Sequence, residues 1–455
     1  MRLLAAAVFL FAMTASAPAQ EPPPPKAPVV VDRTAELQKA MTDLRGLKFT
    51  KPVTVGDYSK DELVAFIRRE LDRELPKEDA AKIRAALVHF GLIPPELDFY
   101  QTIIDLLGAA VAGFYHPKTK ELRLIKPGEG ATEEDEVIDM GGIKFNQREM
   151  TLVHELCHAA QDQNFDLVTV PIELKTNDDV VLATQALIEG DATVVGFKWA
   201  LKDKYDAFAG MISGSYKTGE LGGNTGKVPA FLRMSLTFPY GYGSEFVTAV
   251  LGKAKDDWSA VSNAFADLPG STEQILHPKK YFGEVRDYPQ DIAIDGLEGI
   301  VGDGWKLTYH NVFGEFGTRL LLDEFKVQTA KTRRAAAEGW DGDRYFILTN
   351  DKGATAGVWM SVWDSEDDAK EFYTSYALVL DSKLEGAEKV VADQMTTYTR
   401  KDTVAILERR GAEVLVLDGF GAAVGSRANK IWSAAKKTEI RKVERVIPKD
   451  APKNK

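Results

Sequence analysis

The chain has 455 residues, of which 44% are hydrophobic and 27% are charged, so it is long enough for two or three folded domains. A net charge of −11 argues against nucleic acid or an anionic membrane surface as the partner. Cys157 is the one cysteine in the sequence, which excludes an intramolecular disulfide. We interpret it as a packing residue of a helix and not as a nucleophile, because buried thiols are usually inert.

Residues 1–19 have the pattern of a secretory signal peptide. One arginine precedes an apolar run over 3–13, and small residues form an A-x-A site at 17–19. The run is too short to span a bilayer comfortably, so no membrane segment is expected after signal removal. Residues 20–33 form a proline-rich linker. The pattern predicts a secreted or periplasmic protein.

Four segments with helical patterns follow the linker, separated by Pro and Gly signals. We expect helices over 34–44, 60–74, 77–90 and 99–107. They could form an inhibitory prosegment or a subdomain that packs on the next part of the chain. The subdomain is favoured, because no dibasic cleavage site or flexible linker follows them.

A β-hairpin is expected over residues 111–125, with its turn at 116–120. Exposed sheet edges bind extended peptides, so Tyr115 and His116 are candidates for residues near a site. Because turns are usually exposed, His116 is expected to be a solvated turn residue.

A helix is expected over residues 147–163. Asn146 and Glu149 have capping-box spacing at its start, and no Gly or Pro interrupts it. Its middle carries an HExxH motif, HELCH, at 154–158. The motif would therefore lie on a rigid element.

On this helix His154 and His158 are four residues apart, so both side chains lie on one face and can bind one metal ion. Glu155 projects beside them, where it can take a proton from a metal-bound water. Because the motif is short, its interpretation depends on a third ligand.

Two places could supply that ligand. In a compact pattern, Gly follows the second histidine after three residues and the ligand follows three residues later, but this chain has Gln161 and Asn164 there. The alternative is an acidic residue on a second helix, expected over 180–201. Glu189 lies in that segment, and Gly190 beside it is expected to let the two helices approach. We therefore assign Glu189 as the third ligand.

The segment HELCHAAQDQ followed by ALIEGDA resembles the gluzincin group of zinc metallopeptidases, whose ligands are the two histidines of HExxH and a downstream glutamate. The resemblance implies a zincin-like catalytic core, bound Zn²⁺ and hydrolysis of peptide bonds. In zincins the strand before the metal helix commonly pairs with an extended substrate. The segments GFYHP, STEQILHP and GWDGDRY add a looser similarity, in their order, to secreted bacterial and archaeal proteins of unassigned role.

Residues 209–229 are rich in Gly and Ser and are expected to form a mobile loop, or alternatively a lid. Tyr240 and Tyr242, in the helical pattern that follows, could hydrogen-bond a substrate oxyanion, but are expected to pack in the core. Hydrolysis needs a hydrogen-bond donor for the oxyanion. His277 is our candidate, because Pro278 tends to hold it extended, and its alternative role is a structural histidine that hydrogen-bonds backbone.

Beyond residue 304 helical and strand patterns alternate. Helices are expected over 312–325, 329–337 and 366–380, and strands over 345–348, 357–363, 404–409 and 413–417. This order predicts a small α+β domain with an antiparallel sheet. The Lys-rich tail, 436–455, is expected to be a solvated helix and a disordered end.

The expected fold class is therefore α+β. Residues 34–303 would form a mainly helical, zincin-like catalytic domain with a small edge sheet, and residues 304–455 a second domain. We expect a secreted zinc metalloendopeptidase acting on a peptide or protein substrate, with Zn²⁺ on His154, His158 and Glu189 and with Glu155 and His277 as catalytic residues. The alternative is a non-catalytic secreted binding protein that retains the zinc-binding core. The oligomeric state does not follow from the sequence.

Overall fold

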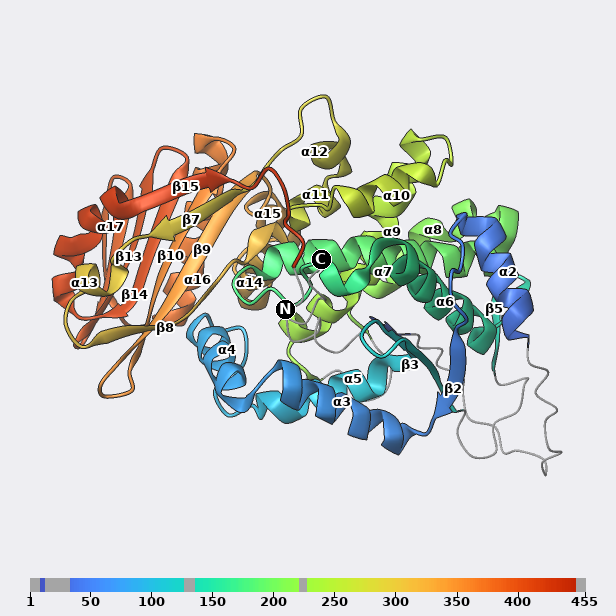
Figure 1. Cartoon of the computed structure of the whole chain (residues 1–455). Helices are drawn as coiled ribbons and strands as arrows, with labels where there is room; N and C mark the ends of the chain where they lie inside the picture. The colour runs from blue at the N-terminus through green and yellow to red at the C-terminus, as the bar shows by residue number, and fades with distance from the viewer. Residues whose placement is uncertain (1–8, 13–32, 127–135, 221–226, 447–455) are drawn as a thin grey trace, which may run out of the picture.

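The structure, a computed structural model, describes residues 9–12, 33–126, 136–220 and 227–446 (Figure 1). It confirms a mixed α+β fold, with a largely helical first part and an antiparallel sheet in the C-terminal part. Most of the predicted signal peptide and linker lies outside the described residues.

The four expected N-terminal helices are all present. They are α2 (Thr34–Arg45), α3 (Lys60–Glu74), α4 (Lys77–His89) and α5 (Phe99–Ala110). Ser59 forms a complete capping box with Glu62 at the start of α3, and Asp98 caps α5. Side chains of α3, α4 and α5 belong to the main hydrophobic core, and those of α2 to a smaller core beside it. The four helices are therefore part of the folded body.

The expected hairpin forms β3 (Val111–His116) and β4 (Glu121–Ile125). Two strands that were not predicted complete its sheet. β2 (Thr54–Tyr58) pairs in parallel with β4, and β1 (Phe9–Ala12) pairs antiparallel with β3. A second hairpin, β5 (Val137–Met140) and β6 (Ile143–Asn146), leads directly into the next helix.

Three long helices form the centre of the first part: α6 (Gln147–Phe165), α7 (Asp178–Leu201) and α9 (Ala230–Lys253). α6 begins where expected, because the Asn146 side chain accepts a hydrogen bond from the backbone amide of Glu149. α7 packs against both α6 and α9. Within the described residues, the stretch Asp178–Lys217 is long and apolar enough to cross a membrane, but 94% of its most apolar window is buried inside the protein.

Two expectations about this region are wrong. Residues 209–217 of the supposed mobile loop lie in helix α8 (Tyr205–Lys217), because Ile212 and Tyr216 give it a buried face despite its Gly and Ser content. Residues 221–226 of the same segment lie outside the described residues. Gly190 packs against Gly243 of α9 and not against α6, whereas Gly196 is the α7 glycine that lies beside α6.

Three short helices lead into the C-terminal part: α10 (Ser259–Ala266), α11 (Thr272–Leu276) and α12 (Pro278–Phe282). That part contains a seven-stranded antiparallel sheet in the order β11-β12-β13-β14-β10-β9-β8. Its strands are β8 (Trp305–Asn311), β9 (Trp340–Asn350), β10 (Thr355–Trp363), β11 (Glu388–Ala392), β12 (Met395–Arg400), β13 (Thr403–Arg410) and β14 (Glu413–Phe420). The four predicted strands are confirmed within β9, β10, β13 and β14, while β8, β11 and β12 were not predicted.

Both faces of the central strands of this sheet are covered, and side chains alternate between them. The edge strand β11 is exposed over its whole length. Trp359 of β10 belongs to the main core, together with α14 (Gly314–Phe325) and α16 (Glu366–Lys383). Its neighbour Met360 belongs to a second core, together with α13 (Leu297–Val301) and α17 (Ala428–Ala434). The short α15 (Ala330–Ala335) joins α14 to β9. The main core thus continues from the N-terminal helices to one face of the sheet.

The C-terminal part begins before residue 304. β7 (Gln290–Ile294) pairs with β15 (Ala435–Glu439), and Ile292 and Ile294 belong to the second core. The prediction of a helix at the start of the tail is therefore wrong, because pairing with β7 holds residues 435–439 as a strand. Residues 447–455, the predicted disordered end, lie outside the described residues.

Candidate metal centre

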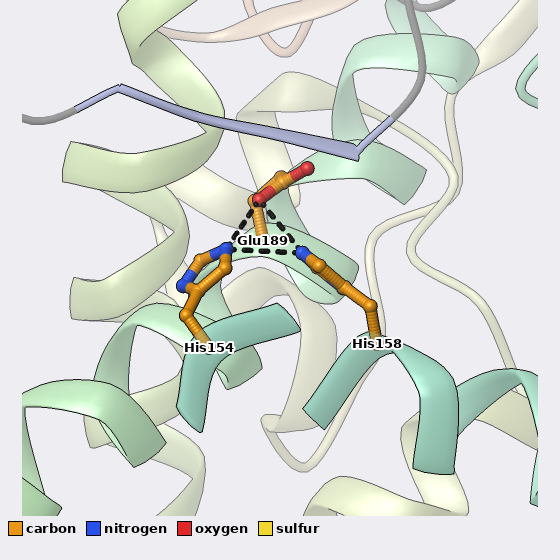
Figure 2. Close-up of side chains that lie close together, drawn as sticks. All are labelled: His154, His158 and Glu189. Carbon is orange, nitrogen blue, oxygen red and sulfur yellow. Dashed lines mark hydrogen bonds and ion pairs between the residues drawn. The ribbon is translucent and has the colours of Figure 1, made fainter. Parts of the chain in front are cut away.

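The side chains of His154, His158 and Glu189 meet between α6 and α7 (Figure 2). The Nε2 atoms of the two histidines are 3.0 Å apart, and each lies 3.2 Å from Oε2 of Glu189. All three residues are buried. The structure therefore brings together the three residues that were assigned as ligands from the sequence.

Two capped helices hold these side chains. Asn146 caps α6 and Asn177 caps α7, in each case by accepting a hydrogen bond from a backbone amide of the first turn. All three residues lie well inside their helices, and the spacing of four residues puts both histidines on one face. The group is therefore set on rigid elements.

The donor set and its spacing fit zinc. Two imidazole nitrogens and one carboxylate oxygen are a known set for catalytic zinc, which keeps a fourth position for water or substrate. Ligands about 2.0–2.1 Å from a tetrahedral ion lie about 3.3 Å from one another. The separations of 3.0 and 3.2 Å in this group are close to that value.

The protonation states also suit a cation. Burial lowers the pKa of His154 to about 4, so its imidazole is neutral at neutral pH. Burial raises the pKa of Glu189, but its interactions with His158 and His154 outweigh burial and hold that pKa below its ordinary value. The group thus contains an ionised carboxylate next to a neutral imidazole.

Glu155 is fully buried next to this group. Among the described residues, neither of its carboxyl oxygens has a hydrogen-bond partner. Burial, and then the charge of Glu189, raise the pKa of Glu155 well above its ordinary value. The backbone amide of Tyr115 opposes this rise without forming a hydrogen bond of normal geometry. An unpaired buried carboxyl group is costly, so its position fits a water or substrate molecule beside it.

Tyr240 of α9 also reaches the group. Its ring is stacked on that of His154, with 6.3 Å between centroids, and its side chain hydrogen-bonds Glu189. Burial and then the charge of Glu189 raise the pKa of Tyr240 well above its ordinary value, so its hydroxyl group stays protonated.

The other two tyrosines considered from the sequence have partners elsewhere. The hydroxyl of Tyr115 donates to Asp162 at 2.7 Å, and that of Tyr242 accepts from Arg319 at 3.2 Å. The expectation that Tyr240 and Tyr242 are buried is confirmed, with 3% and 8% exposure.

The side chain of His277 contacts Glu315 and none of the three side chains of the metal centre. It lies between α11 and α12, and its Nε2 is 2.9 Å from Oε1 of Glu315 in α14, which raises the pKa of His277. The same segment contacts α7 through Thr272 and Asp179. Asp179 precedes Glu189 by ten residues, or about 15 Å along a helix. The catalytic role expected for His277 finds no support in these contacts, which fit a structural histidine whose partner is a carboxylate and not backbone.

The expectation for His116 is wrong, because this residue is 2% exposed. Its Nδ1 accepts a hydrogen bond from the amide of Thr119, and its Nε2 lies 3.2 Å from Glu70 of α3. Packing of α3 against the hairpin thus buries a turn that the local sequence marks as exposed.

Three residues linked to His158 by a chain of hydrogen bonds were not identified from the sequence. Nδ1 of His158 is 2.8 Å from Gln161, the Gln161 amide nitrogen donates to Asp191 at 2.9 Å, and Arg45 of α2 donates to Asp191 at 2.7 Å. Gln161 follows His158 by three residues, a helical spacing that could have revealed it. Arg45 precedes Asp191 by 146 residues, and no local pattern connects them.

Within the described residues, a second group has three carboxylates close together: Glu273, Asp287 and Asp364. Nζ of Lys280 lies 2.6 to 2.8 Å from all three. We interpret this group as an ion-pair network that connects α12 to the end of β10.

A family model described as a domain of unknown function (DUF8575) matches residues 306–428, which contain β9 to β14. No curated protein and no solved structure matches the chain. The similarity therefore covers the C-terminal sheet and does not include His154, His158 or Glu189.

Proposed function

We propose that this protein is an exported zinc metallopeptidase that hydrolyses peptide bonds within a polypeptide chain. The observation that carries the proposal is the unpaired, buried carboxyl group of Glu155 beside the three side chains of the metal centre. A structural zinc site is closed by four protein ligands, whereas a catalytic site has three and a neighbouring base. This centre has the second composition.

Zinc, when bound, polarises the scissile carbonyl and makes a water molecule more acidic. Glu155 accepts the proton of the attacking water and passes it to the leaving amine. A general base that later acts as an acid needs a pKa closer to neutral than that of an ordinary glutamate. Burial and the charge of Glu189 both raise the pKa of Glu155 in that direction.

The edge of β3 binds the substrate in extended form. In the full chain β1 takes this edge antiparallel, with Phe9 opposite Tyr115 and Ala12 opposite Val111. β1 also packs against α6, the helix that carries His154 and His158. Because β1 belongs to the predicted signal peptide, signal removal frees the edge for an extended peptide in the same direction.

Tyr240 donates the hydrogen bond that stabilises the oxyanion. Its hydroxyl group is a protonated donor that lies at Glu189, within the metal centre. The hydroxyl group of Tyr115 donates to Asp162 and that of Tyr242 accepts from Arg319, and neither partner is one of the three side chains of the metal centre. Tyr240 therefore takes the role that the sequence pattern suggested for His277.

Cleavage of a mixed peptide library tests the proposal. The chain without residues 1–19 is loaded with zinc and incubated with the library, and mass spectrometry identifies the cleaved bonds. We expect cleavage that stops with a chelator and returns with added zinc. Zinc-loaded protein that cleaves no peptide would overturn the proposal and favour the alternative, a non-catalytic binding protein with a zinc-binding core.

A further inference from the structure

Three buried side chains form a chain of hydrogen bonds that ends at His158. We propose that Gln161 and Asp191 are positioning residues that hold His158 in the tautomer that binds a metal, and that Arg45 holds Asp191 in place. We call these three residues the positioning network. The inference rests on the proposed zinc centre and concerns residues outside its ligand set.

Gln161 determines the tautomer of His158. Its Nε2 lies 3.1 Å from the carbonyl oxygen of Ile188 and 2.9 Å from Oδ2 of Asp191, and both of these atoms are acceptors. The amide nitrogen must face them, so Oε1, which lies 2.8 Å from Nδ1 of His158, accepts a hydrogen bond from the ring. Nδ1 then carries the proton, and Nε2 has the lone pair that a metal ligand needs.

Asp191 determines the orientation of Gln161. Its Oδ2 accepts from Gln161 and its Oδ1 accepts from Arg45, so the position needs two acceptors. An asparagine has one acceptor and one donor, and it would either face Arg45 with its donor or reverse the Gln161 amide. A reversed amide would present a donor to Nδ1 of His158 and favour the tautomer with its proton on Nε2, which cannot bind metal there.

Arg45 holds the far end of the network. The ion pair between Arg45 and Asp191 is almost completely buried, with 1% and 0% exposure. The guanidinium also donates to Ser262 at 3.1 Å and lies 4.8 Å from the ring centre of Trp258. Buried ion pairs contribute little net stability, because desolvation offsets their attraction. The location of this pair, one hydrogen bond from Gln161, instead fits a role in orienting the centre.

Exchanging the carboxylate of Asp191 with the amide of Gln161 tests this order of donors and acceptors. Asp191→Asn disturbs one hydrogen bond of the network, and Gln161→Glu places a second carboxylate opposite Asp191. The double variant moves the carboxylate to position 161. This carboxylate accepts hydrogen bonds from Nδ1 of His158 and from the amide nitrogen of the new asparagine at position 191. The amide oxygen of that asparagine accepts from Arg45. The hydrogen bond from position 161 to the carbonyl oxygen of Ile188 is lost, and a carboxylate oxygen faces that carbonyl instead.

The readouts are the zinc Kd from chelator competition, the absorption spectrum of the cobalt-substituted protein, and the thermal unfolding of the metal-free protein as a check of folding. We expect each single variant to bind zinc about 10- to 100-fold more weakly, and the double variant to regain most of that loss. Glu189→Ala, which removes a direct ligand, should weaken zinc binding further. Gln163→Glu is the matched control, because the Gln163 side chain on α6 hydrogen-bonds the backbone of Lys51. This variant should bind zinc with the wild-type Kd.

Folded single variants with the zinc Kd and cobalt spectrum of the wild type would overturn the inference, as would a double variant in which the two losses multiply. If Asp191→Asn does not fold, Gln161→Met removes the acceptor for Nδ1 without adding charge and must weaken zinc binding. If the variants change the zinc Kd as expected but the wild type hydrolyses no peptide, the proposed function alone is overturned. Hydrolysis with wild-type zinc binding in Asp191→Asn would overturn the positioning network alone.

Discussion

Gly190 of α7 and Gly243 of α9 pack backbone to backbone. A Cβ atom on Gly190 would lie 2.3 Å from the carbonyl group of Gly243, and one on Gly243 would lie 2.2 Å from the carbonyl oxygen of Ala186. Backbone atoms of two packed helices cannot move aside as a flexible side chain can. This close approach brings α9, which carries Tyr240, next to the helix that carries Glu189.

Gly190→Ala and Gly243→Ala should each lower the free energy of unfolding by about 1–3 kcal/mol or more, the effect of overpacking a close contact. Gly252→Ala in the same helix α9 is the control, because no atom of the described residues outside its own stretch of helix lies within 4 Å of the new Cβ. It should be neutral or stabilising, by up to about 1 kcal/mol. Chemical denaturation measures all three variants, and equal stabilities would show that the close approach is not required.

Tyr240→Phe should lower kcat by about 10²-fold, the scale of losing an oxyanion donor, with zinc still bound. Tyr242→Phe is the matched control, since its hydroxyl group contacts Arg319. His277→Ala should keep a kcat near that of the wild type, because the partner of His277 is Glu315. The rate of peptide hydrolysis by the three zinc-loaded variants gives these kcat values. Full activity of Tyr240→Phe together with a large loss in His277→Ala would return the donor role to His277.

Asp179 should make the protein less stable as the pH rises. Burial raises its pKa from 3.8 to about 7, although Thr272 donates hydrogen bonds to it. Between these values the unfolded state has released a proton that the folded state retains, so stability falls with rising pH, and the full cost is reached above pH 7. Asp179→Asn should therefore raise the free energy of unfolding by roughly 1–4 kcal/mol at pH 8 and by less at pH 5. Denaturation at both pH values measures the difference, and an equal change at both would contradict this prediction.

Arg45→Ala should lower the free energy of unfolding by about 3–5 kcal/mol, because it leaves the charge of Asp191 buried without its partner. Arg33→Ala at the other end of α2 removes two ion pairs of an exposed guanidinium, with Glu36 and Glu149, and should cost about 0–2 kcal/mol. Urea denaturation compares the two. If the N-terminal helices were an inhibitory prosegment, removal of α2 would instead raise peptidase activity without loss of stability.

Local patterns were sufficient for the helices that carry His154, His158 and Glu189. Capping by Asn146 and the spacing of His154 and His158 act within a few residues, so they can be recognised in the sequence alone. The same holds for the N-terminal helices and for the strands with regular apolar alternation. Glu189 was also found this way, since its helix has a long apolar pattern.

The features that were missed depend on partners far apart in the chain. β2 needs β4 for its parallel pairing, and β15 needs β7, which precedes it by more than a hundred residues. Pro278 correctly predicted a non-helical backbone at His277, but the direction of the His277 side chain depends on Glu315 of a later helix. Arg45 and Asp191 meet only because α2 packs on the central helices. No pattern within one segment contains that information.

Peptide hydrolysis per bound zinc, compared between the wild type and Glu155→Gln, tests the metallopeptidase proposal most directly. The substitution keeps His154, His158 and Glu189 and removes only the proton acceptor. The proposal predicts that both proteins bind zinc equally and that hydrolysis falls by about 10²-fold or more in Glu155→Gln, the scale of general base catalysis. Zinc bound equally by both proteins, with no more hydrolysis by the wild type than by the variant, would contradict it.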